Sequence, residues 1–113
     1  MKRGTMVLAP FPFTDLSSLK LRPALLVSRS DRADNDVVVA FIGSYRGQVL
    51  ATADLLIEAS HTDFASTGLK ASSFIRLDKL ATLDGSILLG EIGELSAALV
   101  QTVNEKLRYA LEL

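Results

Sequence analysis

The run Val37–Ile42, VVVAFI, contains no polar side chain. Successive side chains of a strand point to opposite faces, so a strand with this sequence is apolar on both faces. Short apolar runs rich in β-branched residues are typical of strands buried inside a sheet. The stretch therefore predicts a central, doubly buried strand.

Other strand-like segments surround this run, with turn residues between them. They are predicted at residues 5–9, 24–28, 55–58, 73–77 and 87–89. Pro10 and Pro12 cannot donate to a β-ladder, so we expect them to end the first segment. Many short strands at this spacing are typical of a small barrel or sandwich.

The C-terminal part of the chain has helical periodicity. Apolar residues recur every fourth position, at Leu95, Leu99, Val103, Leu107 and Leu111, and this spacing lines one face of a helix. Ser96 is the predicted N-cap, because its hydroxyl can accept an unpaired first-turn N–H. We therefore expect a single mainly β domain over residues 1–113, with a barrel over about 3–92 and one C-terminal α-helix over about 96–111.

Composition bounds the class of protein. The chain has 113 residues, 49% of them hydrophobic, and a mean hydropathy of +0.32, so much apolar surface must be buried, some of it in a subunit interface. No apolar run approaches the ~20 residues of a membrane helix, and the first residues lack the apolar stretch of a secretion signal. We expect a cytoplasmic protein that does not bind membranes.

Metal and cofactor chemistry is not expected. The chain has no cysteine and one histidine, His61, which removes disulfides, thiolate nucleophiles and the usual zinc ligand sets. A Gly-rich phosphate loop, a nucleophile elbow and an HExxH motif are all missing. Any function must therefore rest on other side chains.

Charge is divided unevenly along the chain. Residues 1–50 hold seven Lys/Arg and four Asp/Glu, a net charge of +3, whereas residues 51–113 hold five and nine, a net charge of -4. The total of -1 argues against a broad nucleic-acid binder. An anionic ligand is expected to meet the first half of the fold.

Three segments combine charge, hydroxyl and turn chemistry beside predicted strands. In residues 11–23, Arg22 stands where an apolar strand begins and can present two N–H groups to a phosphate. A solvent-facing cation, or one that neutralises Asp15, is the competing interpretation and the commoner case. At Arg76-Leu77-Asp78, the charged residues share one strand face, either as a site or as a surface ion pair.

The third segment is Gly43–Gly47, GSYRG. An aromatic ring next to a cation suits an unpaired base and its phosphate, and a plain hairpin turn is the alternative.

Together, the blocks 3–11, 21–28, 67–83 and 90–95 resemble, in this order, the PemK/MazF family of ribosome-independent endoribonuclease toxins. The resemblance covers nearly the whole chain.

The resemblance implies a small SH3-like barrel of the PemK/MazF/CcdB type, usually a symmetric homodimer. It implies inhibition by a cognate antitoxin whose extended tail occupies the RNA groove. It also implies that Arg22 contacts the reacting phosphate of single-stranded RNA, with Arg76 and Asp78 in acid–base roles. The 2′-hydroxyl would attack the adjacent phosphodiester without metal or cofactor. The predicted RNA-binding residues are Thr14, Ser17, Lys20, Tyr45 and Arg46.

Two departures from the family pattern matter. Gly43 stands where members often have Thr. The adjacent Ser44 is predicted to supply the catalytic hydroxyl instead, although a shift by one residue reverses side-chain direction. Leu16–Ser18 replaces a loop histidine found in some members. Asp78 next to a cation is a poor base, so catalysis would depend on electrostatic stabilisation by the two arginines. Slow or sequence-restricted cleavage is predicted.

Two other functions stay open. A barrel of the gyrase-poison type would act by protein binding through its C-terminal helix, but residues 108–113 lack a tryptophan-type anchor. The second alternative hypothesis is a decayed toxin that binds and titrates an antitoxin.

Overall fold

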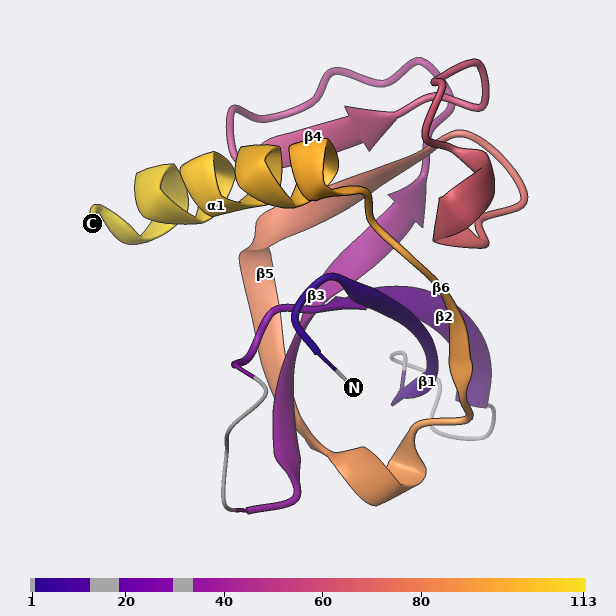
Figure 1. Cartoon of the computed structure of the whole chain (residues 1–113), viewed down its shortest axis with the longest axis vertical. Coiled ribbons are helices and arrows are strands. Elements are labelled where there is room, and N and C mark those ends of the chain that lie inside the picture. The colour runs from indigo at the N-terminus through magenta and orange to yellow at the C-terminus, as the bar shows by residue number, and fades with distance from the viewer. Residues whose placement is uncertain (1, 13–18, 30–33) are drawn as a thin grey trace.

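The computed structural model describes residues 2–12, 19–29 and 34–113. Within them, six antiparallel strands form one sheet in the order β4-β5-β3-β2-β1-β6, which curls into a half-barrel (Figure 1). The strands are β1 (Thr5–Pro12), β2 (Leu19–Leu26), β3 (Asp36–Ser44), β4 (Asp54–Ile57), β5 (Ser73–Asp84) and β6 (Glu91–Glu94). The helices are α1 (Ala97–Leu111) and two 3₁₀ turns, η1 (Ala65–Thr67) and η2 (Gly85–Ile87).

The prediction of a doubly buried central strand is confirmed by β3. This strand lies between β2 and β5, and its two faces belong to different apolar clusters. Ala40 and Ile42 pack in the cluster that includes the buried face of α1. Val39 packs in a second cluster with Val7 and Leu26. The sheet therefore has a core on each side.

The C-terminal helix is confirmed, with bounds close to those predicted. Leu99, Val103 and Leu107 are buried, whereas Leu111 is 53% exposed. Ser96 is the N-cap: its Oγ accepts the N–H of Leu99 at 3.3 Å and donates to Asp63 Oδ2 at 2.7 Å. In the described part of the chain, no helix has the length and apolar character needed to cross a membrane.

The expectation that Pro10 and Pro12 end the first strand is wrong. The N–H of Leu8 donates to Gly90 O at 3.1 Å, away from β2. Positions 10 and 12 share this direction because strand geometry repeats every two residues. The missing N–H groups thus face the edge of the sheet, where proline is tolerated, and β1 continues to Pro12.

The predicted strand at residues 87–89 is also wrong. Residues 85–87 form η2, and the strand that pairs with β1 is β6. Asp84 caps η2 by accepting the N–H of Ser86 at 2.9 Å, and it also accepts from Asn35 Nδ2 at 2.8 Å. The backbone hydrogen bond from Ser86 is the main reason that the pKa of Asp84 is lowered. This local turn overrides the β-character of the apolar residues after it.

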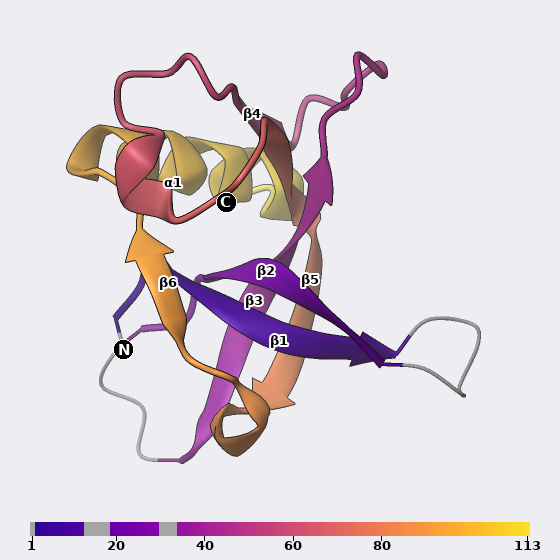
Figure 2. The same cartoon turned by 90° about the vertical axis from the view of Figure 1, so that its right-hand side faces the viewer.

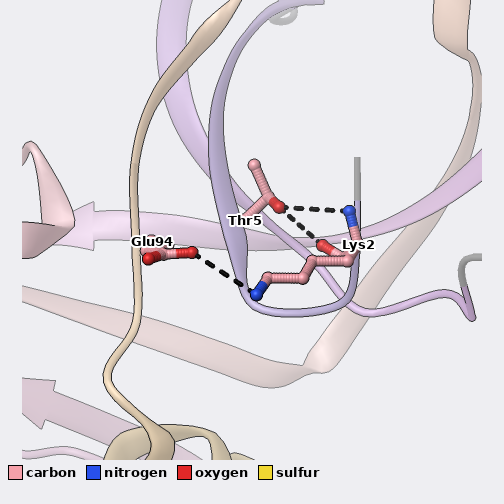
Figure 3. Close-up of polar contacts among 3 residues, drawn as sticks. All are labelled: Lys2, Thr5 and Glu94. Atoms are coloured by element: carbon pink, nitrogen blue, oxygen red, sulfur yellow. Dashed lines mark hydrogen bonds and ion pairs between the residues drawn. The ribbon is translucent and has the colours of Figure 1, made fainter.

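The N-terminal turn is closed by hydrogen bonds of Thr5, and it contacts β6 through an ion pair of Lys2 with Glu94 (Figure 3). Thr5 Oγ1 donates to Lys2 O at 2.6 Å and accepts the Lys2 N–H at 3.3 Å. Lys2 Nζ lies 3.8 Å from Glu94 Oε2, with both side chains more than half exposed. The turn therefore relies on the backbone and hydroxyl bonds, since such an exposed ion pair contributes little.

Candidate active site

The sheet forks where β2 leaves β3. In the described ranges, β2 pairs with β3 only from Ala24 to Leu26. Residues 19–23 pair with β1, and residues 42–44 pair with β5. Figure 2 shows the result: the β1–β2 ribbon runs in one direction, while β3, β4 and β5 run in another. We call the point at Ala24 and Phe41 the fork.

Pro23 explains where the fork opens. Just past the end of β2, the N–H of Val27 donates to the carbonyl oxygen of Val38 in β3 at 2.9 Å. By the two-residue period of a strand, the N–H groups at positions 25 and 23 point the same way. Proline has no N–H, so the β2–β3 ladder cannot continue at position 23.

Arg22 and Arg76 lie on the same face of the sheet, one on each branch of the fork. Phe41 is paired with Ala24 on one side and with Arg76 on the other, and directly paired residues project to one face. Arg22 shares that face because it lies two residues before Ala24. Both arginines are half-buried. The register thus places on one face two cations that are 54 positions apart in the sequence.

Asp54 is the ion-pair partner of Arg76, and sequence reasoning missed it. Its Oδ1 lies 4.0 Å from Arg76 Nε, and its side chain is 6% exposed. Its Oδ2 accepts the N–H of Ala51 at 2.8 Å. No local signal marks this aspartate, because its partner lies in β5, on the far side of a long loop.

Asp78 lies in a β-bulge. Ala40 pairs with Leu80 and Phe41 pairs with Arg76, so residues 77–79 have no opposite residue in β3. The predicted burial of the neighbouring apolar positions is confirmed, since Ile75 and Leu77 are fully buried. Asp78 is exposed, and its side chain makes no hydrogen bond or ion pair with a described residue. A bulge redirects side chains, so the simple two-residue rule no longer places Asp78 beside Arg76.

The structure gives a reason for Gly43. It is paired with Phe74, and a Cβ added to Gly43 would lie 2.9 Å from two atoms of the Phe74 ring. The ring therefore fills the place that a side chain at position 43 would need. Ser44 is exposed and paired with Ser73, which puts it on the opposite face from Arg76.

For the ribonuclease activity that the resemblance implies, replacing Ser44 by alanine is expected to change the rate by less than about twofold, because a hydroxyl on the far face could not reach a phosphate bound at Arg76. Steady-state cleavage of a labelled RNA by both proteins measures this. A loss of tenfold or more would restore the catalytic role predicted for Ser44 from the sequence.

The predicted RNA-binding residues lie on both branches. Lys20 is exposed and shares the Arg22 face of β2. Tyr45 and Arg46 follow β3, and their turn is closed by Gln48, whose Oε1 accepts the Arg46 N–H at 2.6 Å. Thr14 and Ser17 lie outside the described residues.

A hollow of about 880 Å³ lies elsewhere, beside the C-terminal end of α1. Arg3, Arg29 and Arg108 line it together with apolar residues that include Leu107 and Leu111. None of the predicted site residues that the structure describes lines it. The hollow and the fork are therefore separate features.

The fold defines a class: small curled β-sheet proteins with one C-terminal helix. The chain belongs to the family of PemK-like, MazF-like toxins of type II toxin–antitoxin systems, whose model matches residues 2–111. The resemblance to this family is thus confirmed. No curated protein matches the sequence.

Solved structures with the same fold include MazF proteins. One is an endoribonuclease in complex with its cognate antitoxin from a mycobacterial species, which is 22% identical to this chain. The match covers 100% of this chain and 96% of the endoribonuclease, with a TM-score of 0.75. Mycobacterium tuberculosis toxin MazF-mt6 is 23% identical, with coverage of 96% and 97% and a TM-score of 0.74. A MazE–MazF structure from Deinococcus radiodurans is 18% identical, with coverage of 100% and 96% and a TM-score of 0.74. At these identities, the likeness concerns the fold.

Proposed function

We propose that this toxin is a metal-independent endoribonuclease that cleaves single-stranded mRNA in the cytoplasm. The observation that carries the proposal is the placement of Arg22 and Arg76 on one face at the fork. Two cations on the same face of neighbouring branches can both contribute to binding one phosphodiester. An arginine can also donate two parallel N–H groups to phosphate oxygens.

In the proposed reaction, the 2′-oxygen attacks the adjacent phosphorus. The new O–P bond forms as the bond from phosphorus to the 5′-oxygen breaks, leaving a 2′,3′-cyclic phosphate and a 5′-hydroxyl. The 2′-hydroxyl loses one proton, and the leaving 5′-oxygen gains one. Arg22 and Arg76 stabilise the negative charge that develops on the non-bridging oxygens of the phosphoryl group, and we assign Asp78, exposed at the bulge, to proton transfer. Unpaired RNA reaches the required in-line geometry more easily than a duplex.

We also propose that the toxin works as a homodimer and that its natural inhibitor is a cognate antitoxin. Support comes from the fold: solved structures with the same architecture are described as a complex with a cognate antitoxin and as MazE–MazF assemblies. The high apolar content of the chain is consistent with a subunit interface.

The test is incubation of the purified protein with a mixture of single-stranded RNAs in EDTA. Discrete fragments with 2′,3′-cyclic phosphate ends are expected, and an RNA with hydrogen in place of the 2′-hydroxyl at the cleaved position should stay intact. A requirement for added metal would contradict the proposed mechanism.

Intact RNA would contradict the enzymatic function itself. Growth arrest that survives Arg22→Ala but is lost when α1 is truncated would then indicate the protein-binding alternative.

A further inference from the structure

The buried carboxylate of Asp54 lies next to Arg76. Asp54 is directly opposite Arg76 in the β4–β5 ladder, and the two charged atoms that face each other, Asp54 Oδ1 and Arg76 Nε, are buried without a hydrogen-bond partner among the described residues. Burying a carboxylate is costly unless an opposite charge is close. At 4.0 Å, Arg76 supplies that charge.

The carboxylate is held in a fixed orientation by its own turn. Ala51 N–H donates to Asp54 Oδ2 at 2.8 Å, and Asp54 N–H donates to Ala51 O at 3.0 Å. These two bonds close the turn that leads into β4. They leave Oδ1 directed at Arg76.

The two ends of the Arg76 side chain differ in exposure. Nε is buried, yet the side chain as a whole is 36% exposed. The exposure therefore lies elsewhere on the side chain, and the two Nη groups are its remaining donors. A guanidinium is rigid and planar, so the ion-pair attraction of its Nε edge to Asp54 also orients the Nη groups.

We propose that Asp54 is a positioning residue that orients Arg76 toward the scissile phosphate; this role rests on the proposed ribonuclease function. Asp54 also offsets part of the positive charge of Arg76. Removal of the Asp54 carboxylate should leave the Arg76 side chain less well oriented and so lower kcat. RNA should bind equally well or more tightly. This split distinguishes a positioning role from a general loss of structure.

Asp54→Asn is the informative variant, because the amide keeps the size of the side chain and can still accept from Ala51. We expect kcat for RNA cleavage to fall about 10- to 100-fold. The Kd for an RNA lacking the reactive 2′-hydroxyl should be unchanged or tighter. In an Arg76→Ala background, Asp54→Asn should cause no further loss, since the two residues act as one unit.

Glu58→Gln is the matched control: it removes one negative charge from an exposed carboxylate next to the end of β4 and should leave kcat unchanged. A second readout needs no RNA. The Arg76 Nε–H resonance, identified by its loss in Arg76→Ala, should move and exchange faster with water in Asp54→Asn but not in Glu58→Gln.

The outcomes separate the two proposals. Wild-type protein that leaves RNA intact contradicts the ribonuclease function, whatever the resonance does. An Arg76 Nε–H resonance that is identical in wild type and Asp54→Asn overturns the positioning role. Equal losses of activity from Asp54→Asn with and without Arg76 also overturn it.

Discussion

Arg22→Ala is expected to lower kcat for RNA cleavage by about 10²- to 10³-fold, the usual loss when one preorganised donor to a developing negative charge is removed. Arg22 lies next to Pro23, which ends the β2–β3 ladder, and its own backbone stays paired with Ala9 in β1. The Arg22 side chain therefore extends from a paired strand at the open end of the fork. Single-turnover cleavage of a labelled RNA measures the effect.

Two variants test whether the loss of activity in Arg22→Ala comes from the paired N–H groups of its guanidinium and not from its charge alone. Arg22→Lys keeps the charge but loses the paired N–H groups, so it should recover only part of the activity. Lys70→Ala removes an exposed cation from the loop before β5 and should cleave like wild type. Equal losses in Arg22→Ala and Lys70→Ala would mean that overall charge explains the result and that Arg22 has no special role.

Elements with a strong local pattern were predictable. The apolar run of β3 and the four-residue spacing of α1 both reflect which faces are buried, and burial dominates the formation of such elements. The interpretation of Pro10 failed for a different reason. A proline ends a strand only when its missing N–H faces a neighbouring strand, and the sequence does not tell which side of β1 is the edge.

The candidate site was predictable only in part, since it is assembled from long-range pairs. The family resemblance led to Arg22 and Arg76, and the sheet register places both on one face. The pairing of Arg76 with Asp54 depends on how β4 aligns with β5. The seating of the Phe74 ring over Gly43 depends equally on register. Neither contact has a local sequence signal.

Gly68→Ala is expected to destabilise the fold by about 3 kcal/mol, the largest stability effect that we predict. Gly68 has φ +76°, and a Cβ there would overlap the carbonyl oxygen of Ile92 in β6. The left-handed conformation costs an alanine roughly 1–2 kcal/mol. Overpacking adds about 1–3 kcal/mol, because the obstacle is backbone and not a flexible side chain.

The turn at Gly68 cannot move aside easily. Thr67 is fully buried; its Oγ1 donates to Phe64 O at 2.7 Å and accepts the Leu69 N–H at 3.1 Å. Relief of the clash would have to separate η1 from β6, and β6 is the strand that pairs with β1. We therefore expect the midpoint of thermal unfolding, measured at fixed protein concentration, to fall by more than about 10 °C.

Gly47→Ala separates the two contributions to the Gly68 effect. Gly47 has φ +85°, close to that of Gly68, but a Cβ there would have no atom within 4 Å. This variant therefore carries the conformational cost alone and should lose about 1–2 kcal/mol. Urea unfolding of both variants gives the difference, which we assign to contact with the Ile92 carbonyl. Equal losses would show that backbone conformation explains the whole effect and that close packing of η1 on β6 contributes nothing.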